Sequence, residues 1–206
     1  MPGLLGKKLG MTSIYTEDGT IIPVTVLEVG LCKIYDVKTK EKDGYEALKI
    51  GFGSKKEKHV NKPEMGFYNK VDAAPASVLK EFRNFNISDH KVGDELTVEV
   101  FQIGDLVKVS GKSKGKGFQG VIKRHGFSGV GGRTHGQHNR ERAPGSIGSS
   151  SYPSRVFKGQ RMAGRTGYSK VTVSGLRVVR IMPEKNIIMI KGALPGAINS
   201  IVEINK

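Results

Sequence analysis

The sequence predicts a mainly β protein with one short helix and one long, largely irregular basic insertion between two strands. Short runs of β-branched and other apolar residues alternate with turn residues over most of the chain. Strand character stops near residue 109 and resumes near residue 171. The segment between these points carries nearly all of the net positive charge, so we expect a folded body and an inserted segment with different tasks.

The first strands are expected in the N-terminal quarter of the chain. Strand signals begin at Ile14 and are strongest over residues 20–29. That run is too densely apolar for simple alternation, which indicates burial on much of both faces, and Pro23 places it near an edge or a bulge. Further strands are predicted at residues 31–37 and 45–52.

The next segment is expected to contain the one short helix. A turn at residues 42–44 joins the two preceding strands, and the polar residues 54–74 are expected to form a loop. Apolar residues then recur at helical spacing after a proline, including Val78 and Leu79. This pattern predicts a helix over residues 76–85.

The remaining strands lie on both sides of the insertion. They are predicted at residues 96–101, 106–109, 171–182, 186–190 and 201–204. We therefore expect residues 1–107 and 171–206 to form one body and residues 108–170 to form the insertion.

Charge is distributed very unevenly along the chain. The 206 residues contain 34 Lys plus Arg and 19 Asp plus Glu, for a net charge of +15. Residues 108–170 hold 14 of the bases and a single acid, Glu141, whereas the rest of the chain holds 20 bases and 18 acids. A surplus of this size indicates a polyanionic partner. The insertion also has too few aliphatic residues to form a core of its own.

The insertion has the composition of an RNA-binding segment. It contains 14 of the 28 glycines, which let a backbone approach phosphates closely, and its Arg side chains can bind phosphates with two hydrogen bonds. Phe118, Phe127, Tyr152, Phe157 and Tyr168 are spread among the basic residues. Rings in such positions can stack on unpaired RNA bases. We therefore predict an RNA-binding protein.

Other classes of partner are less favoured. A disordered linker has no need of five aromatic residues, and the glycines oppose a membrane-surface helix. No apolar run approaches the roughly 18–20 residues that span a bilayer, and residues 1–11 lack the apolar centre of a signal peptide, which predicts a cytosolic protein without a membrane partner. Cys32, the single cysteine, allows no internal disulfide and is expected in the core. A DNA-binding architectural protein stays an alternative.

Catalytic and metal sites are not supported by the motifs. Residues 111–115 match the nucleophile pattern G-x-S-x-G, but no apolar helix follows and Glu141 is the only acid near enough in sequence to orient a histidine. The histidines of the insertion, His125, His135 and His138, are not accompanied by the thiolates or carboxylates of a metal site. We predict no enzymatic activity, no metal, no cofactor and no small-molecule substrate.

Several motifs point to a known family. The run GKSKGKGFQGVIKR at residues 111–124 resembles the signature of the ribosomal protein L3 family of the large ribosomal subunit. Stretches resembling its bacterial branch follow the family order at residues 3–12, 134–148, 156–164 and 191–196, and so cover essentially the whole chain. Two positions depart from the family pattern: Lys stands at 108 in place of the usual Asp or Asn, and residues 149–151 are serines where some members carry a methylated glutamine.

The resemblance implies a fold and a role. The body would be a β-barrel of the kind found in translation factors, and the insertion would extend through large-subunit rRNA toward the peptidyl transferase centre, with its tip around residues 124–142. It also implies a part in early subunit assembly, neighbouring large-subunit ribosomal proteins as partners, and a ribosome-bound, cytoplasmic location. The competing class is an enzyme or translation factor that only visits the ribosome, but the sequence contains neither a nucleotide-phosphate loop nor a carboxylate cluster.

The predicted contacts with RNA are the cationic and histidine side chains of the insertion, with two lysines near the N-terminus as a second contact. The predicted rRNA-binding residues are Lys7, Lys8, Lys112, Lys114, Lys116, Lys123, Arg124, His125, Arg133, His135, His138, Arg140, Arg142, Arg155, Lys158, Arg161, Arg165 and Lys170.

Overall fold

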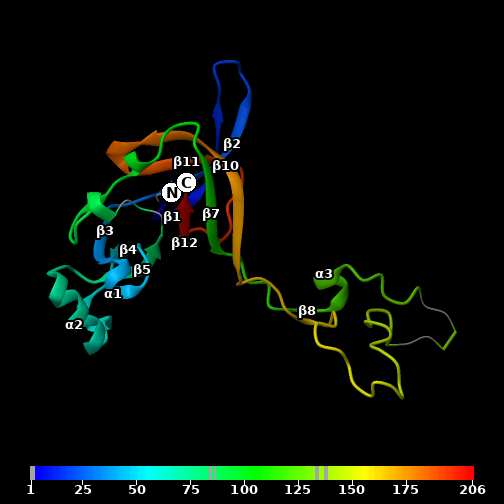
Figure 1. Ribbon diagram of the computed structural model, residues 1–206. Helices are drawn as coiled ribbons and strands as arrows, with labels where there is room; N and C mark the ends of the chain where they lie inside the picture. The colour runs from blue at the N-terminus through cyan, green and yellow to red at the C-terminus, as the bar shows by residue number, and fades with distance from the viewer. Residues whose placement is uncertain (1–2, 84, 86, 133–134, 137–138) are drawn as a thin grey trace. The chain divides into compact units, whose positions relative to one another are not determined.

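The computed structural model describes residues 3–83, 85, 87–132, 135–136 and 139–206. It divides the chain into two compact units, which we call the body (Met1–Ser113 with Lys170–Lys206) and the extension (Lys114–Ser169). Figure 1 traces the strands of the body and the helix α3 of the extension. In the described part of the chain, no helix combines the length and the apolar character needed to cross a membrane.

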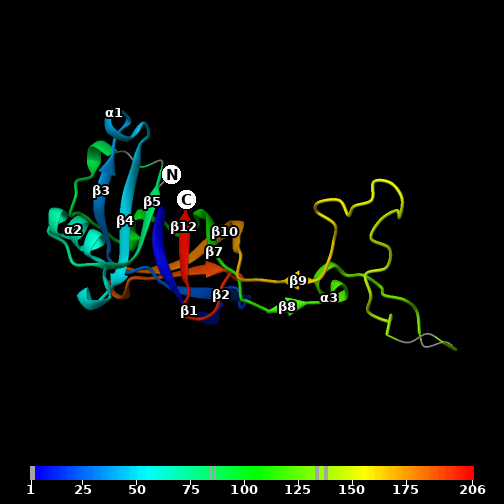
Figure 2. The same cartoon turned by 90° about the horizontal axis from the view of Figure 1, so that it is seen from below.

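A closed barrel of six antiparallel strands forms the larger part of the body (Figures 1 and 2). Its strand order is β1-β12-β7-β10-β11-β2, and closure leaves no strand of the barrel with an unpaired edge. The mainly β fold class with a barrel is thereby confirmed. The barrel strands are β1 (Gly3–Tyr15), β2 (Ile21–Glu28), β7 (Leu106–Lys112), β10 (Lys170–Met182), β11 (Ile187–Lys191) and β12 (Ile201–Asn205).

Strand β1 begins eleven residues before the first expected strand signal, Ile14. Gly6 does not interrupt the strand, because it lies where a neighbouring strand approaches closely. A Cβ on Gly6 would lie 3.1 Å from a Val29 methyl and 3.3 Å from the Glu28 carbonyl oxygen. Leu4 and Leu5 are fully buried in the core. The sequence pattern missed this strand because glycines and lysines break up its apolar residues.

A second, four-stranded antiparallel sheet packs against the barrel and shares its core. Its order is β5-β4-β3-β6, and the fully buried Ile34, Leu48 and Ile50 belong to the same apolar cluster as Leu4 and Leu5. Cys32 is buried there as expected, and desolvation raises the pKa of its thiol to about 11. The strands are β3 (Cys32–Lys38), β4 (Ala47–Ser54), β5 (Ala76–Phe82) and β6 (Glu95–Leu96).

The predicted helix over residues 76–85 is wrong, since this segment contains strand β5. Val78 lies opposite Phe52 and Leu79 opposite Gly51 in the antiparallel pair with β4. The apolar residues that resembled one face of a helix are therefore distributed on a strand, where sheet pairing overrides the local pattern.

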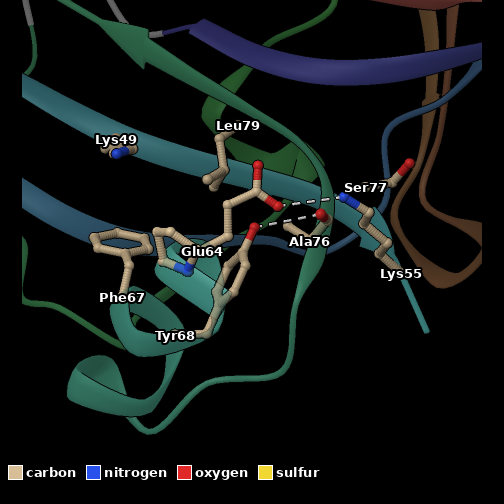
Figure 3. Close-up of a pocket in the computed structure, with 9 residues that line it drawn as sticks. Lys49, Lys55, Glu64, Phe67, Tyr68, Ala76, Ser77 and Leu79 are labelled. Atoms are coloured by element: carbon tan, nitrogen blue, oxygen red, sulfur yellow. Dashed lines mark hydrogen bonds and ion pairs between the residues drawn. The ribbon is translucent and has the colours of Figure 1, made fainter. Parts of the chain in front are cut away.

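The main helix of the body lies in the segment that was expected to be a loop. Helix α2 (Lys62–Val71) starts after Asn61 with a proline in its first turn and ends at Asp72 in the left-handed conformation. Its buried Tyr68 packs edge-on against Tyr35 with 5.4 Å between the ring centres. The Tyr68 hydroxyl donates a hydrogen bond to the Ala76 carbonyl (Figure 3). Because Tyr68 is the only buried residue of α2, its sequence lacks a clear apolar helical face, although Phe67 and Val71 also pack in the same cluster.

The other helical segments are short. They are α1 (Lys40–Asp43), α3 (Val121–His125) and the 3₁₀ turns Glu57–His59, Ile87–Asp89, Val98–Val100 and Pro183–Lys185. The first of them replaces the simple turn expected at residues 42–44, and Gly44 ends it with φ 78°. The strand expected at residues 96–101 is only Glu95–Leu96 followed by a 3₁₀ turn.

Lys8 is built into the barrel. Only 7% of its surface is exposed, and its ammonium group donates to the carbonyl oxygens of Leu194 at 2.8 Å and Gly196 at 3.2 Å. A buried ammonium group is retained where several acceptors satisfy it. Although Lys8 was predicted to bind RNA, its charged group is occupied by the fold, and we leave it out of the proposed interface.

Lys8→Met is expected to destabilise the body by about 2 kcal/mol, because it leaves two inward-facing carbonyls without a charged donor while keeping the volume. The free energy of unfolding from urea titrations followed by circular dichroism measures this change. Lys7→Met, on the adjacent and half-buried position of the same strand, serves as the control and should change stability by no more than about 0.5 kcal/mol. Equal losses for the two variants would contradict the structural role of the Lys8 ammonium group.

Candidate nucleic-acid interface

The extension leaves and re-enters the body through two paired strands. Strand β7 ends at Lys112 and β10 begins at Lys170, and these two exposed lysines lie opposite each other in the antiparallel register. Like charges in such a pair repel each other. Glu203 on the neighbouring strand β12 offsets part of this repulsion, because its carboxylate lies 2.8 Å from the Lys170 ammonium and 3.1 Å from that of Lys80.

The Glu203 carboxylate is held in its charged form. Burial raises its pKa, but the bonds from Lys170 and Lys80 outweigh this effect, so that the pKa of Glu203 lies below its ordinary value. Lys80 comes from β5 and was not among the predicted site residues. Nothing in the local sequence marks it, since only the tertiary fold brings β5 to Glu203.

The first part of the extension is a narrow two-stranded ribbon. Strand β8 (Phe118–Gln119) pairs with β9 (Gly164–Arg165). The ladder continues where the Lys116 amide donates to the Thr166 carbonyl at 2.9 Å and the Thr166 amide donates to the Gly117 carbonyl at 3.0 Å. The ribbon therefore presents the exposed Lys114, Lys116 and Arg165 from one hydrogen-bonded frame.

Backbone contact in this ribbon depends on glycine. Gly167 has φ 77°, and a Cβ there would collide with the Lys114 carbonyl oxygen. An ordinary residue would therefore push apart the two chain segments that present the cations. Arg165 also places its guanidinium 4.9 Å from the centre of the Tyr168 ring, which fixes a cation beside an aromatic face.

A one-turn helix follows the ribbon and carries three more of the residues that were predicted to bind RNA. Helix α3 is anchored by the buried Val121 and ends at Gly126 with φ 74°. Its Arg124 donates to the Met162 carbonyl oxygen at 2.7 Å, and Nε2 of His125 lies 3.1 Å from the same oxygen. A Cβ on Gly164 would lie 2.5 Å from Nη1 of Arg124, so this glycine makes room for the guanidinium group. Lys123 of the same helix is exposed.

The far part of the extension is folded by contacts between backbones. The Val130 amide donates to the carbonyl oxygen of Glu141 at 3.3 Å, and Gly129, with φ 78°, has no room for a Cβ against the same oxygen. Arg140 and Arg142 flank this contact, and both are exposed. His135 is exposed as well, whereas the predicted residues Arg133 and His138 lie outside the described part of the chain.

The later part of the extension, after residue 150, carries the remaining predicted cations and several solvent-exposed aromatic rings. Arg155, Lys158 and Arg161 are exposed, and the Arg155 guanidinium lies 5.7 Å from the centre of the Phe157 ring. The exposed fractions are 75% for Phe118, 86% for Tyr152, 62% for Phe157 and 56% for Tyr168. Large apolar groups exposed to this degree mark an interaction surface.

The extension as a whole can bind an extended polyanion. It has eleven Lys plus Arg and one acid in 56 residues, and the described cations have exposed side chains. No cluster of three or more potential metal ligands occurs among the residues that the structure describes. The sequence predicted these cations but not the ribbon, the Arg124 anchor or the Gly129 contact, all of which depend on residues distant in sequence.

These features define a class of protein, namely a β-barrel body with a cationic, glycine-rich extension inserted between two of its strands. Residues 81–186 match the family described as Ribosomal protein L3. The chain is 53% identical over 205 residues to "Large ribosomal subunit protein uL3" of Chloroherpeton thalassium, with 99% of this chain and 98% of the relative covered. It is equally identical to the protein of the same name from Syntrophotalea carbinolica, with 99% and 97% covered.

The chain therefore belongs to the ribosomal protein L3 family. The predicted family is confirmed, and with it a structural, non-enzymatic and ribosome-associated role in the large subunit.

The pH dependence of stability should reveal the Glu203 cluster. Because its folded-state pKa is lowered, Glu203 contributes stability that is present above its ordinary pKa of 4.5 and is lost as the pH falls through that value toward the folded-state pKa. We expect Glu203→Gln to be less stable than the wild type at pH 7 and to lose less stability on acidification. The midpoint of thermal unfolding between pH 7 and pH 3 measures this.

Glu184→Gln is the matched control, because Glu184 is exposed in the 3₁₀ turn after β10. It should follow the wild-type profile throughout. If Glu203→Gln and Glu184→Gln gave the same pH profile, the ion pairs of Glu203 would contribute nothing to stability.

Proposed function

We propose that this protein binds large-subunit rRNA through its extension. The observation that supports this most directly is the combination of eleven bases and one acid on a glycine-rich backbone, in a chain of a large-subunit ribosomal family. Exposed Lys and Arg side chains replace the counterions of crowded phosphates, and release of those counterions favours binding. The body, with 23 bases and 18 acids, is much closer to neutral per residue than the extension.

Recognition in this proposal rests on RNA shape together with stacking. The extension contains a single carboxylate side chain, Glu141, to compete with phosphates for its cations. Arg124 is held by the Met162 carbonyl oxygen and so presents its remaining N–H groups in a fixed direction. Phe118 and Tyr152 offer ring faces for unpaired bases, which is how many proteins read RNA that is not in a helix.

We further propose that the extension reaches toward the peptidyl transferase centre, that the protein supports early assembly of the large subunit, and that it works on cytoplasmic ribosomes beside neighbouring large-subunit proteins. Membership of the family supports these proposals. A segment with little apolar material of its own gains order when RNA folds around it, which suits an early assembly role.

Removing three positive charges from the extension should reduce the salt dependence of rRNA binding. We expect Lys114→Gln, Lys116→Gln and Lys123→Gln combined to lower the slope of log K against log salt by about 2 to 3, because each neutralised phosphate contributes roughly 0.7 to 0.9. Filter binding of a large-subunit rRNA transcript at several KCl concentrations measures the slope.

The control removes the same charge from the body through Lys42→Gln, Lys58→Gln and Lys70→Gln, all at exposed positions. This variant should keep the wild-type slope. Equal slopes for the two triple variants would show that overall charge, and not the extension, governs binding, and equal affinity for duplex DNA would favour the architectural alternative.

A further inference from the structure

A hollow of about 370 Å³ lies within the extension, beyond helix α3. Residues 126–130 form one side of it and residues 143–145 form the other. This volume is within the range of about 300–1,000 Å³ that is usual for small-ligand sites. Both sides belong to the extension, so its shape depends only on local contacts of that unit.

The walls of the hollow are fixed by backbone interactions. On one side, Gly126 ends α3 with its amide donating to the Ile122 carbonyl at 2.9 Å. On the other side, the Ala143 amide donates to the Arg140 carbonyl at 3.1 Å and closes a turn. The bond from Val130 to the Glu141 carbonyl then ties the two sides together. The hollow is therefore a structured feature and not merely a gap between loops.

The lining is uncharged and combines apolar side chains with polar backbone groups. It contains the Phe127 ring, the side chains of Val130, Ala143 and Pro144, and the backbone of three glycines. The Phe127 ring is positioned by a contact with His125, with 6.0 Å between the ring centres. The Ser128 hydroxyl is the one polar side chain of the lining, and within the described part of the chain it makes no hydrogen bond. It can donate to or accept from a ligand edge.

The residues that precede the two sides of the hollow in the sequence are cationic. Arg142 precedes Ala143, and Arg124 and His125 precede Gly126. An uncharged ligand would gain nothing from these cations, and an inorganic anion has no apolar surface to place against Phe127 and Val130. A nucleotide matches both, since its base is a flat apolar ring with polar edges and its phosphates are anionic.

We propose that this hollow receives one unpaired base of the rRNA, stacked beside Phe127 and bonded at its edge by Ser128, while Arg142, which precedes Ala143, neutralises an adjoining phosphate. The inference rests on the proposed function and adds a defined subsite to it. The subsite reads a base that is extruded from helical stacking, whereas the other cations of the extension contact the backbone.

Filling the hollow tests the proposal. Ala143→Leu in the full-length chain adds bulk to the lining without changing charge. With a large-subunit rRNA transcript, we expect wild-type protein to lower the chemical reactivity of one unpaired nucleotide, and Ala143→Leu to restore the reactivity of that nucleotide alone. Affinity should fall roughly 5- to 100-fold, as for loss of one stacked base, with an unchanged salt slope.

Ala163→Leu is the matched control, because Ala163 is exposed on the extension outside the hollow. It should keep the wild-type footprint and affinity. A second pair of variants removes an aromatic ring. Phe127→Leu should release the same nucleotide, and Tyr15→Leu, which removes an exposed ring of the body, should not. This pair decides the question if Ala143→Leu loses the whole footprint through misfolding.

The outcomes separate the subsite from the function. If the Ala143→Leu and Phe127→Leu footprints both matched those of their controls while rRNA still bound, the base-binding subsite would be overturned and rRNA binding would stand. If the wild-type chain did not bind the transcript with a salt-dependent affinity, the proposed function itself would fail.

Discussion

The antiparallel pairing of β7 with β10 is the constraint on which the rest of the structure depends. It closes one side of the barrel, with Val109 opposite Val173, and it also fixes the two points where the extension begins and ends, at Lys112 opposite Lys170. Val107 and Val109 are buried in the barrel core, so apolar packing in the body holds the ends of the 56-residue extension together. The free energy gained when the barrel folds therefore offsets the entropy lost in closing that long segment, and the extension needs no core of its own.

The extension is organised by a different kind of interaction. Among its described residues only Val121 is a buried hydrophobic side chain. Its shape comes from places where backbones touch, at Gly117 and Thr166, at Gly167 and Lys114, and at Gly129 and Glu141. Such contacts position cations while adding little apolar burial, which leaves the side chains and ring faces available to a partner. A polyanion that fills the space between them would supply the stabilisation that a core supplies elsewhere.

Lysine has two opposite roles in this chain. Lys8 is enclosed, and its ammonium group is satisfied by two carbonyl oxygens of the barrel, whereas Lys114 and Lys116 are exposed on the ribbon. Lys170 lies between these extremes, since it is exposed but paired with Glu203. The surroundings of each lysine decide whether its charge is available to a partner. A lysine whose ammonium group is bonded within the fold is less available to RNA than its residue type alone indicates.

The sequence by itself determined the mainly β class, the family, the excess charge of the inserted segment and the cations that it carries, because composition and long motifs are properties of the chain alone. Only the tertiary structure decided that residues 76–82 form a strand, that α2 covers the second sheet and that β1 starts at Gly3, because each outcome depends on pairing with residues distant in sequence. The tertiary structure likewise decided that Lys8 is buried, that Lys80 pairs with Glu203 and that a hollow forms beside Phe127. These features form where segments distant in sequence make contact, and the free energy of such a contact depends on both segments together.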